Sequence, residues 1–480
     1  MTSTRKSGTE QAWAALGGDP ALLGRVVTDG PEGLLSSRLP VRELARSAVA
    51  VCSLAAAELA ARRTGRPVPP VRIDESAVAT AFVSERHLRI DGRAPSVFAP
   101  LSRFWRCADG WVRTHANYPH HRARLLGTLD LAPDTPDERA VEAVAASFAG
   151  RRGEEIERTV YAAGGLAVAA RTPGRWAAHP QGAAVAGAPL AGRERLDDAP
   201  VRRSAALSGD PLLPAAGVRV LDLSRVIAGP VATRTLALLG ADVLRIDSPR
   251  LPESPDAHAD TGFGKRSVEL DLADPAGAAA FDRLLAGADV VVSGYRPGAL
   301  DRFGLDPESL ARRRPGLVVA RLSAWGPGPW AGRRGFDSLV QVATGIAAME
   351  AGAEGGAEAG AGAKPGVLPA QALDHGTGYL LAAAVLRALT DQHDTGGSRL
   401  VTFSLARTAA WLLGELPAPG APEGAGTGPG YEPERWLTET GGPLGLLRHA
   451  VPPVSFEGGP AGWSRPPGPL GADTAGWLTD

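Results

Sequence analysis

Asp374 is the residue of this sequence best placed to do chemistry, because it stands at the start of a helix expected around Gly376-Thr377-Gly378. Free backbone N–H groups and the helix dipole at such a position stabilise a negative charge. An aspartate there more often simply caps its helix. Its position therefore leaves two alternatives open, a helix cap or a charged carboxylate available for reaction.

A strand, a turn, a helix and a second strand are expected within Val218–Arg250. The apolar residues from Val218 to Leu223 suit a buried strand, and Ala228-Gly229-Pro230 supplies a turn with proline at the first helical position. Gly240 is expected as a left-handed cap before the strand that ends at Asp247. The stretch predicts an α/β fold with a Rossmann-like parallel sheet, in which ligands bind at the carboxyl ends of the strands.

A nicotinamide-dependent dehydrogenase is one class that fits this βαβ unit. Asp247, near the end of the second strand, occupies a suitable position for an acidic residue. The sequence lacks the G-x-G-x-x-G turn that lets the backbone approach a pyrophosphate, which disfavours this class.

Five segments extend the pattern in a fixed order over the middle of the chain. In this order they resemble the class III CoA-transferases, the family of formyl-CoA and carnitine-CoA transferases that also contains the α-methylacyl-CoA racemases. The resemblance implies the parallel-sheet catalytic region together with a smaller α+β domain. The segments are DLSRVIAGPVATRTLALLGADVLRID (222–247), GKRSVELDL (264–272), SGYRPGALDRFGLDPESL (293–310), LSAWGPGPWAGRRGFDSLVQVATG (322–345) and LPAQALDHGTGYLLAAAVLRAL (368–389).

The resemblance implies that Asp374 is a nucleophile. Its carboxylate would attack an acyl-CoA to give a mixed anhydride, and the released thiolate would return to form an enzyme-bound CoA thioester. An acceptor carboxylic acid would then take the CoA. Coenzyme A is thus expected as a thioester substrate, with no permanently bound cofactor and no metal.

The resemblance also implies a set of CoA contacts. Any single arginine among them could equally be a solvated surface cation. The expected contacts are Arg225, Ile227 and Ala228 near the thiol end, Lys265 at the nucleotide, Gly294, Tyr295 and Arg296 in the cleft wall, Arg302 at a phosphate, and Arg334 as a further cationic contact.

Several residues depart from the family pattern, and these departures bear on which function is expected. Phe336 stands where the racemases carry a histidine before an aspartate, and His375 is adjacent to Asp374 rather than evidently opposed to it, so transfer is preferred over racemisation or isomerisation. Asp337 is kept as a structural residue of the site. Phe263 and Ser248 also depart from the pattern. They motivate a third hypothesis, a degenerate CoA-binding protein without catalysis.

Domain order in the chain differs from the family's order. Residues 30–200 resemble the later half of the family and include the small domain, whereas 218–415 resemble the catalytic region. A segment at 1–29, a linker at 201–217 and a Gly/Pro-rich connector with a closing segment at 416–480 complete the chain. An echo between Leu54–Phe82 and Leu381–Leu412 suggests duplication, with Ser47 at the position of Asp374. The stretch 351–366 is predicted as either a lid or a disordered insertion.

Composition favours an enzyme of a reducing compartment. The 480 residues carry a net charge of -1 and only two cysteines, so neither nucleic-acid nor membrane binding is expected, and a cytoplasmic location is predicted. The resemblance implies a homodimer. His115, His120 and His121 are expected in a solvated turn rather than a metal site. Trp325 and Trp330 are expected to pack in the core or to line the acyl cleft.

Overall fold

Seven strands form the central sheet of the computed structural model, which describes residues 6–96, 98–351, 363–418 and 431–478. The strand order is β10-β9-β8-β11-β12-β13-β7, and every neighbouring pair is parallel except β13 with β7. The α/β fold class predicted from the sequence is confirmed. The strands are β7 (Gly192–Arg195), β8 (Arg219–Leu223), β9 (Asp242–Asp247), β10 (Arg266–Glu269), β11 (Val290–Ser293), β12 (Val318–Ser323) and β13 (Arg399–Ser404).

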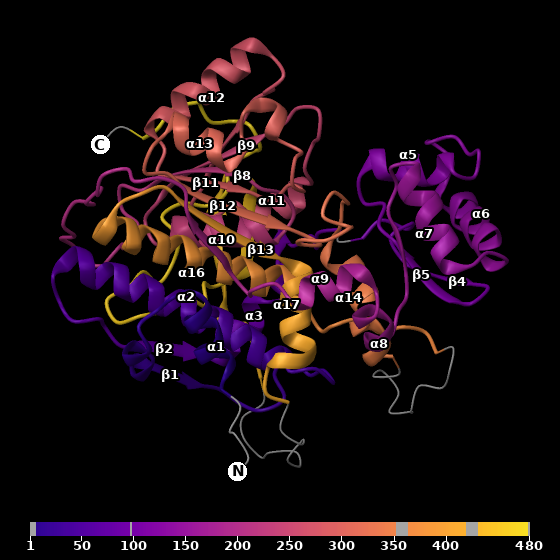
Figure 1. Ribbon diagram of the computed structural model, residues 1–480, viewed down its shortest axis with the longest axis horizontal. Helices are drawn as coiled ribbons and strands as arrows, with labels where there is room; N and C mark the ends of the chain where they lie inside the picture. The colour runs from indigo at the N-terminus through magenta and orange to yellow at the C-terminus, as the bar shows by residue number, and fades with distance from the viewer. Residues whose placement is uncertain (1–5, 97, 352–362, 419–430, 479–480) are drawn as a thin grey trace.

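Helices cover both faces of this sheet (Figure 1). Alternate strand residues point to opposite faces, so Val220 and Val290 join the core beneath α10 and α16, whereas Leu221 and Val291 join the core beneath α12 and α13. The arrangement is a doubly wound sheet, with apolar residues on both faces. The covering helices are α10 (Ala228–Leu238), α12 (Pro275–Gly287), α13 (Pro307–Arg313) and α16 (Ala372–Thr395).

The βαβ unit expected from the sequence is present as β8, α10 and β9. Gly240 has φ +99°, which is the left-handed conformation expected of a residue just beyond the helix. The helix begins at Ala228, so Pro230 is its third residue rather than its first. Proline is tolerated there because the first-turn N–H groups have no partner within the helix.

Two long helices, α2 (Val41–Thr64) and α16, lie side by side and share one core. Each has 24 residues and is followed by a glycine cap. The two residues before them have nearly the same backbone angles, φ -73° with ψ 56° at Pro40 and φ -73° with ψ 61° at Gln371. This likeness is what duplication of one unit would produce, and duplication stays a prediction.

Matching the ends of these helices corrects one detail of the expected repeat. Asp374 is the third residue of α16, and the third residue of α2 is Glu43 rather than Ser47. The early unit therefore does carry a carboxylate at this position. Helix α2 is also the one described helix long and apolar enough to cross a membrane, but 94% of its most apolar window is buried inside the protein.

A smaller α+β domain projects from the sheet domain (Figure 1). Its antiparallel sheet has the order β4-β5-β6, and its own core includes Trp105, Val112 and Phe148. This confirms the smaller domain expected from the sequence. Its elements are β4 (Phe104–Cys107), β5 (Gly110–Thr114), α5 (Pro119–Gly127), α6 (Asp137–Ala149), α7 (Gly153–Ala162) and β6 (Ala167–Ala169).

The sequence boundaries do not divide the fold into separate units. Strand β7, from the 30–200 region, pairs with β13, and Ala472 of the closing segment bridges Val268 in β10. Most of the expected loop at 351–366 and of the connector after 416 lies outside the described residues. The remaining elements are α1 (Gly8–Ala15), β1 (Val26–Asp29), β2 (Val71–Asp74), α3 (Glu75–Ala81), α4 (Ser84–His87), β3 (Arg89–Ile90), α8 (Pro173–Ala177), α9 (Pro180–Ala186), α11 (Pro255–Thr261), α14 (Asp337–Thr344), α15 (Ile346–Met349), α17 (Leu405–Ala410), β14 (Leu437–Gly442) and β15 (Gly445–Ala450).

Candidate active site

A cavity of about 680 Å³ opens where the parallel strands end. The first turn of α16 contributes Asp374 to its wall, and α5 of the smaller domain closes it on another side. Its size suits a large organic ligand. Residues that follow successive strands also line it, namely Ser248 after β9, Leu270 after β10, Gly294 after β11 and Ala324 after β12.

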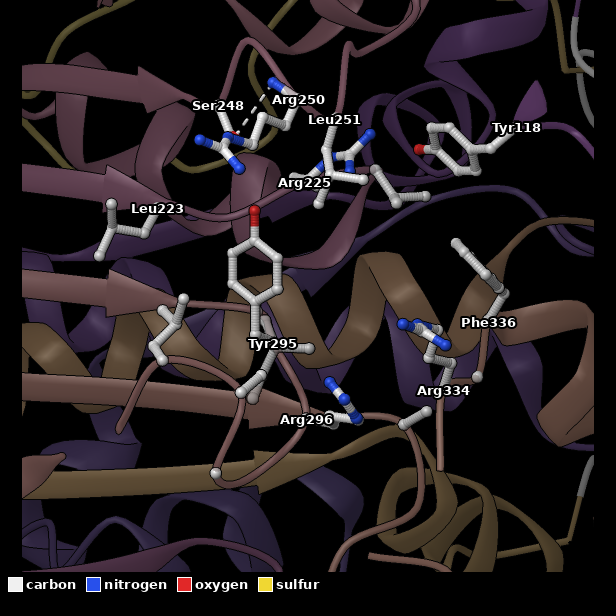
Figure 2. Close-up of a pocket in the computed structure, with 18 of the residues that line it drawn as sticks. Tyr118, Leu223, Arg225, Ser248, Arg250, Leu251, Tyr295, Arg296, Arg334 and Phe336 are labelled. Atoms are coloured by element: carbon white, nitrogen blue, oxygen red, sulfur yellow. Dashed lines mark hydrogen bonds between the residues drawn. The ribbon is translucent and has the colours of Figure 1, made fainter. Parts of the chain in front are cut away.

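Six arginines line the cavity, and three of them have no carboxylate partner. Arg225, Arg250 and Arg333 form salt bridges with nearby acidic residues. Arg296, Arg302 and Arg334 form none with any described residue, and Figure 2 shows Arg296 and Arg334 close together at one side of the cleft. Unpaired guanidinium groups converging on a cavity favour a ligand that carries phosphate or carboxylate groups.

Asp374 is buried, with 6% of its surface exposed, although its side chain reaches the cavity. Its backbone N–H donates a 2.9 Å hydrogen bond to Oδ2 of Asp337, whose Oδ1 accepts from the amide of Gln341. Asp337 therefore holds the first turn of α16 in place, as the sequence analysis expected. The residue before the helix is Gln371, so Asp374 is not the helix cap.

Burial raises the pKa of Asp374 well above its ordinary value, and the carboxylates of Asp337 and Glu85 raise it further. Burial likewise raises the pKa of Asp337. This differs from the ionised carboxylate expected at a helix start, because loss of water and two neighbouring carboxylates outweigh the dipole of one helix turn. The ionised carboxylate of Asp337 opposes ionisation of Asp374, so the two aspartates do not titrate independently.

This pKa shift predicts that Asp374 lowers the stability of the fold as the pH rises. Since the folded-state pKa is above the unfolded value, the stabilising contribution is present at low pH and is lost as the pH rises through the folded pKa. Asn has the same shape and does not ionise. We expect Asp374→Asn to be more stable than the wild type by about 1–3 kcal/mol at pH 8, at about 1.4 kcal/mol per unit of pKa shift, and by much less at pH 5. Urea unfolding at both pH values measures this.

Glu43 provides the control, because it occupies the matching place in α2 but pairs with Arg46 and accepts from the N–H of Gly8. Glu43→Gln should lower the free energy of unfolding at both pH values. A stability difference between Asp374→Asn and the wild type that is the same at pH 5 and pH 8 would contradict the assigned pKa.

Lys265 lies in the core instead of at the expected nucleotide contact. Its side chain has 0% exposure, and its ammonium bonds to Oδ2 of Asp222 at 3.1 Å and to the carbonyl of Pro230 at 2.9 Å. Burial lowers the pKa of Lys265 to about 8. Asp222, at the end of β8, also accepts from Ser224 and Thr233. This ion pair therefore fixes the turn between β8 and α10, and Lys265 acts on the cavity only through that turn.

Lys265 as a member of a buried ion pair and Lys265 as a nucleotide contact predict different mutant behaviour. Removal of one member of a buried ion pair leaves the other charge without compensation, so Lys265→Met should lower the free energy of unfolding by about 3 kcal/mol. The exposed Arg302→Met should leave stability unchanged and raise only the KM for an acyl-CoA. Thermal unfolding compares the two variants. A stable Lys265→Met protein with weakened CoA binding would restore the nucleotide-contact interpretation.

Glu253 is a residue of the site that the sequence analysis missed. Its carboxylate accepts from the N–H of Val226, the guanidinium of Arg225 and the hydroxyl of Tyr118, at 3.1, 3.3 and 2.8 Å. Val226 has φ +70°, a strained conformation for a β-branched residue. Glu253 thus holds the strained turn after β8 and ties it to the smaller domain. No motif in the sequence marks this residue, because Val226, Arg225 and Tyr118 lie 27, 28 and 135 residues from it along the chain.

The histidine segment is not the solvated turn expected from the sequence. His115 and His121 are buried, with 5% and 3% exposure. Phe336 stacks on His115, with 3.8 Å between the ring centroids and an angle of 2° between the rings. Its ring meets that of His121 edge-on, with 5.9 Å between the centroids. His120 and His121 both line the cavity. The smaller domain folds these rings against the sheet domain, and sequence patterning could not show that contact.

The remaining predicted residues divide between the cavity and the core. His375 points to Glu85 at 3.4 Å rather than into the cavity. Phe263 packs against His449 and Trp463, and Ser248 accepts from the N–H of Arg250. Most of the predicted CoA contacts line the cavity, whereas Ile227 does not; those that do are Arg225, Ala228, Gly294, Tyr295, Arg296, Arg302 and Arg334. Trp325 and Trp330 are packed against each other in the core.

This cleft, with cations and the buried Asp374 carboxyl group at the ends of a parallel sheet, is typical of an α/β protein with an anion-binding site. Comparison with known proteins gives the family. Residues 215–435 match the sequence model of CoA-transferase family III.

Three curated relatives show the extent of the likeness. A probable fatty acyl-CoA transferase of Mycobacterium tuberculosis is 35% identical over 219 residues, which cover 43% of this chain and 54% of the relative. An acetyl-coenzyme A transferase of Hypoxylon pulicicidum is 35% identical over a stretch that covers 42% of this chain and 34% of the relative. A formyl-CoA:oxalate CoA-transferase of Rhodopseudomonas palustris is 33% identical, with 39% and 45% covered. The chain therefore spans between a third and just over half of the length of these relatives.

A crystal structure of a hypothetical protein from Mycobacterium tuberculosis is 33% identical to the chain, with a TM-score of 0.38. The likeness covers 43% of this chain and 58% of that one. Both the sequence and the structural comparisons thus cover less than half of the chain.

Proposed function

We propose that the protein transfers CoA from an acyl-CoA thioester to a carboxylic acid through a covalent intermediate on Asp374. The observation that carries this proposal is the placement of Asp374 in the wall of an arginine-lined cavity. The match of residues 215–435 to the model of CoA-transferase family III supports it. Coenzyme A has phosphates for the arginines and an arm that the cavity could admit, and here it is a substrate rather than a resident cofactor.

The proposed reaction needs the carboxylate form of Asp374. One carboxylate oxygen attacks the thioester carbonyl carbon, the C–S bond breaks, and the CoA thiolate leaves a mixed anhydride on the enzyme. The thiolate then attacks the aspartyl carbonyl carbon and releases the donor acid. The acceptor carboxylate repeats the sequence in reverse order and regenerates Asp374. Because burial and two neighbouring carboxylates raise the pKa of Asp374, ionisation of this group costs free energy before the attack.

A racemase or isomerase is the second candidate from the sequence, and the geometry disfavours it. Proton exchange at an α-carbon by two bases needs one base on each face of that carbon. Phe336 carries no exchangeable proton, and His375 faces Glu85 away from the cavity. A degenerate CoA-binding protein is motivated by two departures from the family pattern. Phe263 lies in the core outside the cavity lining, so of the two only Ser248 lines the cavity.

Assembly and location remain predictions from the family resemblance and the composition. We expect a homodimer and a cytoplasmic protein that acts on acyl-CoA and free acids, with neither nucleic acid nor membrane as a partner. Light scattering coupled to gel filtration would measure the mass of the assembly.

Hydroxylamine trapping tests the covalent step. The protein incubated with an acyl-CoA and then with hydroxylamine should carry a hydroxamate at residue 374, detected by peptide mass spectrometry, because both the anhydride and the thioester are activated acyl groups. Asp374→Asn should lose the modification and lower the transfer rate by at least about 10³-fold.

Asp271→Asn is the matched control, since Asp271 lines the same cavity but forms a salt bridge with Arg250. This variant should still be trapped at residue 374. Transfer that proceeds at the wild-type rate in Asp374→Asn, or trapping at another carboxylate, would exclude the proposed intermediate. Exchange of the α-proton with deuterium in the absence of an acceptor acid would favour the racemase.

A further inference from the structure

His121 is a buried polar side chain that has no partner within the protein. Its exposure is 3%, and neither ring nitrogen has a hydrogen-bond partner among the described residues. Burial lowers the pKa of His121 to about 3, so the ring is neutral and offers one N–H donor and one acceptor. Buried polar groups are nearly always paired, so an unpaired one that lines a cavity points to a ligand.

Packing fixes the imidazole in place. His121 lies in the first turn of α5, where its backbone N–H donates to the carbonyl of Tyr118 at 2.9 Å. Its ring contacts that of His120 at 4.0 Å and the edge-on ring of Phe336 at 5.9 Å. A phenylalanine could make the same ring contacts without burying unpaired nitrogens. The polarity of the imidazole is therefore not explained by packing.

Positive charge lies next to this ring. Arg334 is close enough to lower the pKa of both His120 and His121 after the effect of burial, and it forms no salt bridge with a described residue. Figure 2 shows Arg334 beside Phe336, with the Arg296 guanidinium near it. A neutral N–H donor beside an uncompensated guanidinium group is a combination that binds a carboxylate.

The position along the chain separates this carboxylate site from the nucleotide end of the cavity. Arg334 is three residues before Asp337, whose carboxylate accepts from the N–H of Asp374. Arg250 and Arg302 belong instead to the loops after β9 and β11, with Arg250 bonded to Asp271. Arg334 therefore lies on the segment that leads directly into Asp337, the residue that contacts Asp374, and both Arg334 and Asp374 line the cavity.

We propose that His121 and Arg334 form a subsite that binds the distal carboxylate of a short dicarboxylic acid. This inference rests on the proposed transfer reaction. One carboxyl group of the acid exchanges CoA with Asp374 while the other accepts a hydrogen bond from the His121 imidazole and pairs with Arg334. Both residues determine specificity and take no part in bond making. His121 lies outside the family-matched region 215–435, so the preference belongs to the smaller domain of this chain.

Binding of succinate and butyrate to the CoA-free protein, measured by isothermal titration calorimetry, tests the subsite. The two acids have the same chain length and differ by one carboxylate. We expect wild-type protein to bind succinate at least 10-fold more tightly than butyrate. His121→Phe, which keeps the ring packing, should remove this preference, and His121→Gln, which keeps an N–H donor, should restore part of it.

Arg334→Met is a second variant, on a side chain at the cavity surface, in case His121→Phe folds poorly, and it should also remove the preference. Arg302→Met is the control and should leave the succinate preference intact. With transfer followed by mass spectrometry, the KM for succinate as acceptor should rise at least 10-fold in His121→Phe while kcat changes little.

The outcomes separate this subsite from the reaction itself. Equal binding of succinate and butyrate by the wild type, or a succinate preference that survives in both His121→Phe and Arg334→Met, overturns the subsite. Succinate binding that depends on His121, in a protein that transfers CoA from no acyl-CoA tested, would refute the proposed function and retain the carboxylate site. Rapid CoA transfer to butyrate and succinate alike would refute the carboxylate subsite and retain the proposed function.

Discussion

The burial of Asp374 beside Asp337 is the constraint on which the site depends. A carboxyl group surrounded by protein and a second carboxylate resists ionisation, so its reactive form must be stabilised by something that enters the cavity or lines it. The guanidinium groups of Arg296, Arg302 and Arg334 line the same cavity without a salt bridge to any described residue, so an anion that enters the cavity meets uncompensated positive charge.

Two chain regions that are far apart in sequence produce this burial. Helix α2 packs along α16 and shields the helix that carries Asp374, and the smaller domain places Tyr118 and its histidines against Phe336. The carboxylate at the matching position of α2, that of Glu43, is bonded within the protein, because it accepts from the N–H of Gly8 and pairs with the guanidinium of Arg46. Of two similar α–β–α units, one thus keeps its carboxyl group open to a cavity and the other neutralises it.

The sequence predicted those features that are local or that follow from a single strand pattern. The βαβ unit, the left-handed Gly240 and the place of Asp374 at a helix start all depend on neighbouring residues. Lys265 was misplaced because a buried ion pair and a phosphate contact require the same residue type, and only the distance to Asp222 separates them. The contact of Glu253 with Tyr118 and the packing of the histidines could not be predicted, since each joins the smaller domain to residues more than a hundred positions away in the sheet domain.

Phe336 places an aromatic ring without exchangeable protons between the smaller domain and the sheet domain. At this position an imidazole would reach the cavity directly, whereas the phenylalanine instead supplies the surface on which His115 stacks and His121 rests. The ring nitrogens that line the cavity are therefore provided by α5 and not by the segment before α14. A neutral histidine in that place is suited to hold an acid group in position and poorly suited to remove a proton from carbon, because its pKa is far below that of an effective base. The same packing thus disfavours racemisation and leaves both ring nitrogens of His121 without a partner among the described residues at the cavity wall.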